Sequence, residues 1–257
     1  NESPIQAKEY NMATHFKGPV LFSNASAFEN LKMSMWPDQF TYFDDFNQGA
    51  LDATHNWTIV KDSGASAAVV ADSLSGEVNL TSANTTDNDG ASIQAKQESF
   101  ALPTSAGKKL YFETRVKISD ATQTDFLVGF TETFATNPEA ALSSSNVIGF
   151  VKVDGSAIVK GTTESGDTQT LVTFADTTKS TMENDTYVTL GLVATKGTNL
   201  DKVEFYINRN KVGQSTTNIP TANMKVMAMS VSGDATGQKI TTIDYIMAAQ
   251  DRNVSYS

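Results

Sequence analysis

Cysteine is absent from this chain of 257 residues, and histidine occurs only at His15 and His55. The lack of cysteine excludes disulfide bridges and leaves no thiolate to act as a metal ligand or nucleophile. A tetrahedral zinc site would need several carboxylates beside the two histidines. Neither histidine accompanies a nucleophile motif, so we expect no Ser-His-Asp or Cys-His catalytic site. Stability does not require such staples, because a chain of this length buries roughly three quarters of its unfolded surface.

Positive charge is also scarce. The chain has 19 Lys and Arg against 29 Asp and Glu, which gives a formal net charge of −10. This balance argues against a phosphate-binding surface for nucleic acid and against attraction to an anionic membrane. Long apolar runs are missing too: none approaches the ~20 residues needed to cross a bilayer, and the first thirty residues lack the pattern of a secretory signal. We therefore expect a soluble chain that binds neither nucleic acid nor membrane.

The clearest pattern present is the stretch from Tyr111 to Thr133. Its first half alternates apolar and polar residues with a period of two, which predicts a half-buried strand. A polar break at Ser119 to Thr124 precedes a second alternating run that contains Phe126, Val128 and Phe130. The stretch therefore predicts two antiparallel core strands of a β-sandwich.

Short alternating runs continue along the rest of the chain, separated by Gly, Asn, Asp, Ser and Thr. Spacings of about 10 to 15 residues favour an all-β antiparallel sandwich over βαβ units. Asp154-Gly155 and Asn208 to Lys211 have the residue types of tight turns. The runs that predict strands are Phe40 to Phe46, Trp57 to Lys61, Ala67 to Ala71, Gly76 to Thr81, Ala91 to Leu102, Lys108 to Ser119, Asp125 to Thr133, Val147 to Val153, Ser156 to Thr162, Thr168 to Phe174, Tyr187 to Thr195, Lys202 to Asn208, Lys225 to Ser232 and Gln238 to Ala248.

The chain divides into three parts: an N-terminal arm (residues 1–39), a sandwich domain (40–251) and a polar tail (252–257). The arm has isolated apolar residues without a sustained period, and Gly18-Pro19 interrupts regular structure. Ser26 to Glu29 has the spacing of a capping box, which predicts the one short helix. Apolar residues in an arm without its own core need a surface to cover them, either its own sandwich or another protein. The candidate contacts are His15, Phe16, Gly18, Pro19, Val20, Phe22 and Phe28.

Paired carboxylates would be the signature of a sugar-cleaving sandwich. A retaining glycosidase needs two carboxyl groups about 5 Å apart, which Glu-x-Asp-x-Glu on one strand supplies. The single Glu-x-Asp here, Glu183-Asn184-Asp185, lacks the second Glu. Dispersed carboxylates stay open as an alternative, but the residues predict no catalytic site and no enzyme.

Two acidic segments have some features of cation sites. Thr85 to Gly90 is similar to the opening of a calcium loop, yet the twelfth position is Lys96 where a bidentate Glu is needed. Asp44 and Asp45 follow an apolar strand, so one of them must turn inward and find a hydrogen-bond or metal partner. A polar turn and a capped strand end are the simpler interpretations. We therefore predict no metal and no cofactor.

Aromatic residues outside the apolar stripes are candidates for stacking on a glycan. Trp57 and Tyr111 are the two that we select, and packing at a sandwich edge is the alternative for each.

The order of these segments resembles the concanavalin A-like, laminin-G-like jelly-roll sandwiches in structural proteins of tailed bacteriophages. The segments that carry the resemblance are FDDFNQGALDATHNW, LYFETRVKISDATQTDFLVGFTET, VIGFVKVDG, YVTLGLVATKGTNLDKVEFYINRNKVG and ITTIDYIMAAQD, together with HFKGPV in the arm. The likeness covers roughly Phe40 to Asp251 and implies an antiparallel jelly-roll fold. No catalytic carboxylate motif of the sugar-cleaving relatives is present, so no family active site transfers to this chain.

The resemblance implies a non-enzymatic virion protein that decorates or cements a phage head. In this role the arm would contact the major capsid protein or another virion protein, and the sandwich would face outward. The chain would be made in the host cytoplasm, and self-association as a dimer or trimer stays open. The alternative is a carbohydrate-binding or host-recognition domain of a phage fibre.

Overall fold

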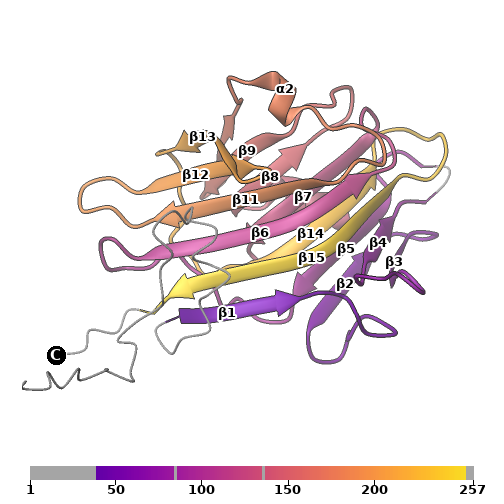
Figure 1. Ribbon diagram of the computed structural model, residues 1–257, viewed down its shortest axis with the longest axis horizontal. Helices are drawn as coiled ribbons and strands as arrows, with labels where there is room; N and C mark the ends of the chain where they lie inside the picture. Colours follow the sequence, from indigo (N-terminus) through magenta and orange to yellow (C-terminus); the bar gives the residue numbers. More distant parts are fainter. Residues whose placement is uncertain (1–38, 84–85, 135–136, 253–257) are drawn as a thin grey trace, which may run out of the picture.

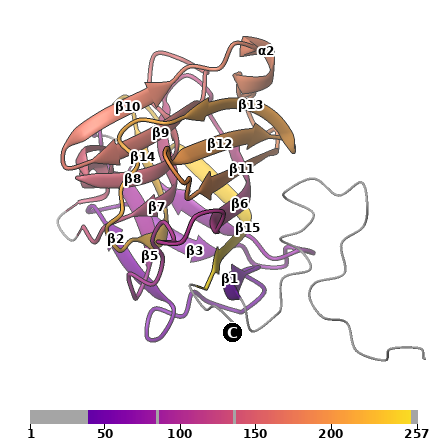
Figure 2. The same ribbon diagram turned by 90° about the vertical axis from the view of Figure 1, so that its left-hand side faces the viewer.

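The chain folds into two antiparallel β-sheets packed face to face, with little helix. The computed structural model describes residues 39–83, 86–134 and 137–252. Figure 1 shows the long strands of one sheet in front, and Figure 2 shows the two layers from the side. The sequence prediction of an all-β jelly-roll sandwich is therefore confirmed.

The first sheet, sheet A, has eight strands in the order β13-β12-β11-β6-β15-β4-β3, and β1 pairs with β15 on the same edge as β4. The strands are β1 (Gln39–Asp44), β3 (Ser66–Val69), β4 (Val78–Thr81), β6 (Lys109–Ile118), β11 (Val188–Thr195), β12 (Lys202–Ile207), β13 (Asn210–Ser215) and β15 (Ile240–Asp251).

The second sheet, sheet B, has seven strands in the order β10-β9-β8-β7-β14-β5-β2. The strands are β2 (Trp57–Lys61), β5 (Gly90–Ala95), β7 (Thr124–Thr131), β8 (Asn146–Lys152), β9 (Lys160–Ser165), β10 (Thr168–Val172) and β14 (Lys225–Ser232).

The two strands predicted from Tyr111 to Thr133 lie in different sheets. β6 belongs to sheet A and β7 to sheet B, so they face each other across the core and do not pair through hydrogen bonds. Their inner side chains meet at Phe112 and Phe130, whose ring centroids are 5.6 Å apart in an edge-to-face arrangement. The predicted alternation along β6 is confirmed, because Leu110, Phe112, Thr114, Val116 and Ile118 are all fully buried.

Two strand predictions were wrong in detail, and one strand was missed. β5 ends at Ala95 and only Phe100 bridges to Met224 beyond it, because residues 96–99 leave the sheet. β9 lies at Lys160–Ser165 rather than Ser156 to Thr162. Both of its faces are buried, with Thr162 and Thr163 on opposite faces, which no apolar pattern reveals. β13 was missed because it is a polar edge strand.

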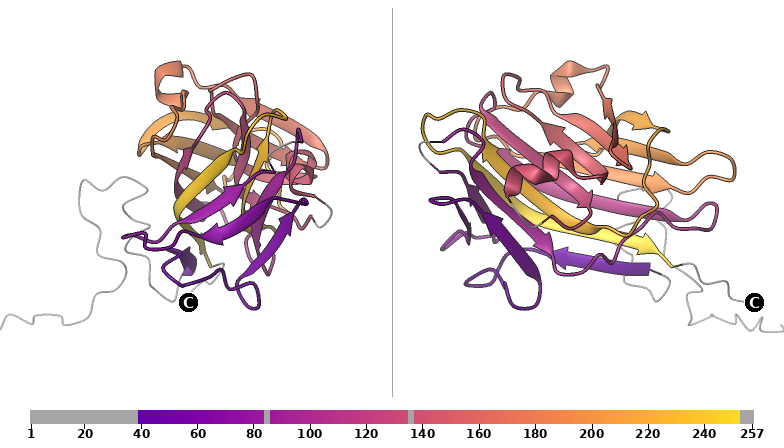
Figure 3. Two further views of the ribbon diagram at one scale, coloured as in Figure 1. Left: turned by 90° about the vertical axis from the view of Figure 1, so that its right-hand side faces the viewer. Right: turned by 180° about the vertical axis from the view of Figure 1, so that it is seen from behind.

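Helix is confined, among the described residues, to two short segments that the sequence did not predict. The 3-10 helix η1 (Pro138–Ser143) lies across the outer face of sheet B, where Ala141 joins a second apolar cluster with Leu127, Val147 and Met229 (Figure 3, right). The α-helix α2 (Thr177–Ser180) is capped by Asp176. The helix predicted from the capping box at Ser26 lies outside the described residues.

The hairpin between β12 and β13 turns at Asn208 and Arg209, which have φ angles of 48° and 64°. Asparagine is among the few residues that tolerate this left-handed backbone. The turn predicted over Asn208 to Lys211 is therefore confirmed for its first two residues, whereas Asn210 and Lys211 already belong to β13.

The sandwich has two poles, one at each end of its long strands. At the first pole, β1 begins and β15 ends, with Gln39 opposite Asp251 in the register. At the other pole, β6 ends at Ile118 and β15 begins at Ile240, and Ile118 pairs with the next residue of β15, Thr241. We call them the Asp251 pole and the Lys239 pole. The twelve residues of β15 separate them by about 40 Å.

Replacement of Phe130 by Ala should lower the free energy of unfolding by about 3–5 kcal/mol, because Phe130 contacts both Phe112 and Phe100 in the closed core. Chemical denaturation monitored by circular dichroism measures the change. Leu200→Ala is the control, since Leu200 is 62% exposed and its loss should stay within about 0.5 kcal/mol. Equal effects of the two substitutions would contradict this account of the core.

Candidate functional site

The seven residues predicted to form the partner contact of the arm, His15, Phe16, Gly18, Pro19, Val20, Phe22 and Phe28, lie outside the described residues. The structure instead describes the base from which the arm departs. At the Asp251 pole, the side chain of Gln39 donates a hydrogen bond to Asp251 Oδ1 (2.8 Å), and the backbone N–H of Lys109 donates to Asp251 Oδ2 (2.8 Å). The guanidinium of Arg252 donates to the Gln39 carbonyl (3.4 Å). Asp251 thus joins β1, β6 and β15 where the arm begins.

Trp57, predicted as a glycan contact, is fully buried. Its ring lies 5.6 Å from Tyr42 and 5.9 Å from Phe46, and its indole N–H donates to Asp44 Oδ2 (2.7 Å). The ring presents no face to a ligand, so its position contradicts the predicted stacking role. The other oxygen of Asp44 accepts from the backbone N–H of Phe46 (2.9 Å). The prediction of a capped strand end with an inward carboxylate is therefore confirmed.

Tyr111, the second predicted glycan contact, is only 7% exposed. It packs on the outer face of sheet A against Val193 and Ala249. Burial, with the negative charge of Asp251, raises the pKa of its hydroxyl. Only a small part of Tyr111 is therefore open to a ligand.

The outer face of sheet A carries a polar and aromatic network around Glu113 and Arg115, which the alternation along β6 places on that face. Glu113, on β6, is 1% exposed and accepts a hydrogen bond from the hydroxyl of Tyr245 (2.7 Å). Its second oxygen has no hydrogen-bond partner among the described residues, and the Nε atom of Arg209 lies 3.7 Å away. Burial and the bond to Glu113 raise the pKa of Tyr245. Tyr245 in turn lies against Phe43, which is 60% exposed, with 6.4 Å between ring centroids.

A second group of side chains continues this network along β6. Arg115 pairs with Asp244 (2.6 Å), and its guanidinium lies 4.0 Å from the ring centroid of Tyr187. The hydroxyl of Tyr187 donates to Glu77. We call the outward side chains of Phe43, Glu113, Arg115, Tyr187 and Tyr245 the Glu113 face.

The chemistry of the Glu113 face differs from a two-carboxylate hydrolytic centre. The side chains that alternate outward along β6 are Glu113, Arg115 and Lys117, so cations follow the single carboxylate on that strand. Glu113 is covered by Tyr245 and Arg209 rather than open to a substrate. In the described part of the chain, no three His, Asp or Glu side chains are arranged to hold a metal ion. The sequence signal that could have revealed this face is a Glu at an outward position between two buried core residues.

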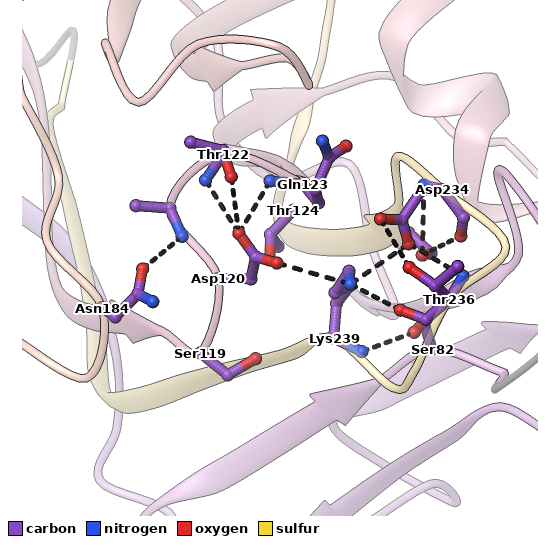
Figure 4. A network of polar contacts seen from close by, with 12 residues as sticks. Ser82, Ser119, Asp120, Thr122, Gln123, Thr124, Asn184, Asp234, Thr236 and Lys239 are labelled. Atoms are coloured by element: carbon purple, nitrogen blue, oxygen red, sulfur yellow. Dashed lines mark hydrogen bonds and ion pairs between the residues drawn. The ribbon is translucent and has the colours of Figure 1, made fainter.

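The Lys239 pole is held by a dense polar network (Figure 4). The ammonium of Lys239, a side chain that is largely buried, lies 3.1 Å from Asp234 and 3.4 Å from Asp120, and it donates to the carbonyl of Thr236 (2.7 Å). The backbone N–H of Lys239 donates to Ser82 Oγ (2.8 Å). One lysine thus joins three loops that are far apart in the sequence.

Asp120 is the second centre of this network. Its Oδ1 accepts from the backbone N–H groups of Thr122 and Gln123, both at 3.0 Å. These bonds and Lys239 lower the pKa of Asp120 against an opposing effect of burial. The same loop is held at Ala121, whose N–H donates to the side chain of Asn184 (2.7 Å). These contacts make the loops of the Lys239 pole a fixed surface.

Beside this network lie a buried acid and a buried base. Asp125, on β7, is almost fully buried and its Oδ1 has no hydrogen-bond partner among the described residues. Burial, Asp154 and Asp87 raise its pKa to about 6 against the effect of Lys152. Burial lowers the pKa of Lys152 to about 8, and its ammonium donates to the carbonyls of Thr124 (2.5 Å) and Val153 (3.3 Å).

The raised pKa of Asp125 makes the stability of the fold depend on pH. A carboxyl with a higher pKa in the folded state stabilises it below its unfolded pKa of 3.8, and this contribution is lost as pH rises through about 6. In the wild type, Asp125 should lower the free energy of unfolding by on the order of 2 kcal/mol between pH 4 and pH 7, and Asp125→Asn should abolish this part of the decrease. Chemical denaturation at both pH values measures the free energy of unfolding. The control Asp72→Asn makes the same charge change at an exposed position and should keep the pH dependence of the wild type. An unchanged pH dependence in Asp125→Asn would refute the assignment.

The fold has well-defined relatives among solved structures, although no protein-family model and no curated protein sequence matches the chain. An endo-1,3-β-glucanase from Streptomyces sioyaensis is 13% identical with a TM-score of 0.57, covering 83% of this chain and 97% of the enzyme. The carbohydrate recognition domain of Emp47p is 13% identical (TM-score 0.54), covering 82% of this chain and 94% of that domain. A Bacillus licheniformis β-glucanase is 15% identical (TM-score 0.52), covering 81% and 97%. These likenesses show that the chain has the jelly-roll β-sandwich fold of concanavalin A-like lectins and glucanases.

The described residues contain no helix long and apolar enough to span a membrane.

Proposed function

We propose that this protein is a non-enzymatic component of a bacteriophage virion. Its N-terminal segment, residues 1–39, attaches to the major capsid protein or another virion protein, and its sandwich faces outward from the head. The observation that carries the proposal is the way the base of the segment is built into the fold. β1 pairs with β15 over six residues, and β15 pairs in turn with β6 and β4. A force on the segment is therefore transmitted directly to the middle of sheet A.

The two poles support this orientation. Both Gln39 and Asp251 lie at one pole, so an attached segment would bring the Asp251 pole toward the shell. The Lys239 pole would then face outward, about 40 Å away. Its loops are held by Lys239, Asp120 and Asp234, as an exposed virion surface requires. The net charge of −10 keeps that surface solvated and makes neighbouring copies repel.

Repetition strengthens this mode of attachment. A shell presents many identical sites, and several weak contacts by linked or neighbouring copies add to a larger avidity. The apolar residues Phe16, Val20, Phe22 and Phe28 would leave water on contact with the shell. The non-enzymatic assignment is supported by the single covered carboxylate on the outer face of β6.

Deletion of residues 1–38 should abolish binding to capsids purified from the phage that encodes the chain, because it removes the attachment segment and leaves β1 in place. Co-sedimentation with capsids, compared between the truncated chain and the chain of 257 residues, measures the loss of binding. A variant with Phe16→Ser and Phe22→Ser should bind weakly, whereas the matched polar control with Asn11→Ser and Asn24→Ser should bind as the wild type does. Undiminished binding after the deletion would overturn the proposal.

A carbohydrate-binding domain is the second candidate function, and the Glu113 face is the observation that favours it. Phe43 offers an exposed ring beside Tyr245, whose hydroxyl is held by the covered carboxylate of Glu113. Exposed aromatic rings are groups that stack on sugars. The Emp47p domain, which is named for carbohydrate recognition, has the same fold.

If this second function holds, a glycan array should give reproducible hits that Phe43→Ala reduces by about tenfold, as expected when a stacking contact of about 1.4 kcal/mol is lost. Leu200→Ala removes an equally exposed apolar side chain elsewhere and should have no effect. An array without hits, or equal binding by both variants, would exclude the Glu113 face as a glycan site.

A further inference from the structure

β1 is an edge strand of sheet A. The same edge of β15 accepts β4 at Ile240–Ile243 and β1 at Ile246–Asp251, and β4 is followed outward by β3. No strand of the described residues follows β1. Because paired strands alternate the direction of their backbone groups, one alternate set of β1 N–H and C=O groups points away from β15. An unpaired edge of this kind is a template for another extended segment.

A cavity follows this free edge. It has a volume of about 390 Å³ and is lined by consecutive β1 residues together with the loop after it: Thr41, Tyr42, Phe43, Asp44, Asp45, Asn47, Gln48 and Asn56. No residue of β15 lines it, so the cavity lies on the unpaired side. A second hollow of about 150 Å³ shares Tyr42 and Asn56 and continues past Phe40 to Phe100. We call the two together the β1 groove.

The β1 groove contains a polar group that lacks a partner. The hydroxyl of Tyr42, a residue that lines both hollows, is buried and makes no hydrogen bond within the described residues. The Oε1 of Gln39, at the start of β1 and outside the groove lining, is likewise buried without a partner in the described part of the chain. A buried polar atom without a partner costs about 1–3 kcal/mol. Phe40 and Tyr42 are only partly covered by the core, and Phe43 is mostly exposed. An added segment would therefore meet both open hydrogen-bonding groups and open apolar surface.

The inner end of the groove is acidic. Asp44 and Asp45 both line it, and the carboxylates of Asp244 and Asp44 add to burial in raising the pKa of Asp45. None of the ion pairs in the described part includes Asp45. A segment with a cation at this end would complement the groove.

We propose that residues His15–Phe22 of the same chain add to the free edge of β1 as an extended antiparallel strand while the protein is free in solution. The inference rests on the proposed function, because attachment would then transfer these residues from the β1 groove to the shell.

One register satisfies the groove along its whole length. Lys17 lies opposite Asp44, Val20 opposite Thr41 and Phe22 opposite Gln39. On the inner face Leu21 then meets Phe40 and Pro19 meets Tyr42, while on the outer face Gly18 leaves room for the ring of Phe43. Glycine beside an aromatic ring and proline without a donor are both tolerated on an edge strand.

The connection is short enough to favour the same chain. Residues 23–38 join Phe22 to Gln39 and can span about 50 Å when extended, whereas β1 is only about 20 Å long. The antiparallel direction also returns Phe22 to the Gln39 end, where β1 begins. A tethered segment of this length has an effective concentration in the millimolar range, so it can occupy the edge of β1 even when its intrinsic affinity is weak. In this register the groove would cover Leu21 and Pro19 and engage the backbone of residues 15–22 until a shell competes for them.

The absence of cysteine permits a direct test in the complete protein. The pair Thr41→Cys and Val20→Cys should form an intramolecular disulfide under mild oxidation, because directly opposed residues bring the Cα atoms within bridging distance. The control pair, Gln214→Cys and Val20→Cys, places the first cysteine on β13, the opposite edge of the same sheet. We expect the first pair to cross-link about tenfold faster, as a monomer with altered mobility on a non-reducing gel.

Three outcomes would overturn the proposal: no cross-link in the Thr41 pair, equal cross-linking in both pairs, or a cross-linked dimer, which would assign the segment to a second copy. Capsid binding separates this inference from the proposed function. The oxidised Thr41 pair should lose capsid binding and regain it on reduction. If cross-linking fails while deletion of residues 1–38 still abolishes binding, the groove assignment is wrong and the attachment role stands. If the oxidised protein binds capsids as well as the reduced one, residues 15–22 are not the attachment segment, although their docking on β1 stands.

Discussion

The contact between the two sheets through phenylalanine is the interaction on which the rest of the structure depends. Phe112 from sheet A meets Phe130 from sheet B, and Phe130 continues to Phe100 and then to Phe40. A second group joins Phe150 of sheet B to Phe205 of sheet A at 5.4 Å. Rings of this size bury about 150–250 Å² each, so a few pairs fix the distance and the relative position of the sheets. Neither sheet has another partner for its inner face among the described residues.

This dependence explains why the fold could be predicted from the sequence. Alternating apolar residues in β6, β7, β11 and β12 predict which face of each strand is buried, and a shift of the register by one residue would expose all of them. The pattern does not predict which strands pair. β6 and β7 are neighbours in the sequence but lie in opposite sheets, because the residues between them cross from one sheet to the other. β9 and β13 were misplaced for a related reason: buried threonine and a polar edge strand leave no apolar period.

The site residues were harder to predict, because their environment depends on distant strands. Trp57 is an aromatic residue at the start of a strand, and nothing local shows that Asp44 and two rings from the β1 segment surround it. The inward carboxylate of Asp44 was predictable, since an acid in an apolar strand needs a partner. The alternation along β6 places Glu113 on the outer face, but its partners Tyr245 and Arg209 come from positions about a hundred residues away and could not be predicted. Sequence identified the need for a partner, but not the partner.

The β1 edge differs from the Lys239 pole because its unsatisfied polar atoms lie beside an open strand edge. At the Lys239 pole, the ammonium of Lys239 pairs with the carboxylates beside it, and the unpartnered atoms of Thr124 and Asp125 lie on β7, an interior strand of sheet B. Along β1, a strand edge, two buried polar atoms and an acidic cavity all lack complements among the described residues. Folded proteins rarely leave several such groups unpaired in one place unless something else covers them. The incomplete edge is also the point where the N-terminal segment joins the sandwich. The open edge and the junction with the N-terminal segment therefore lie on the same side of the molecule, and this is the physical reason for proposing both attachment there and the docking of a segment along β1.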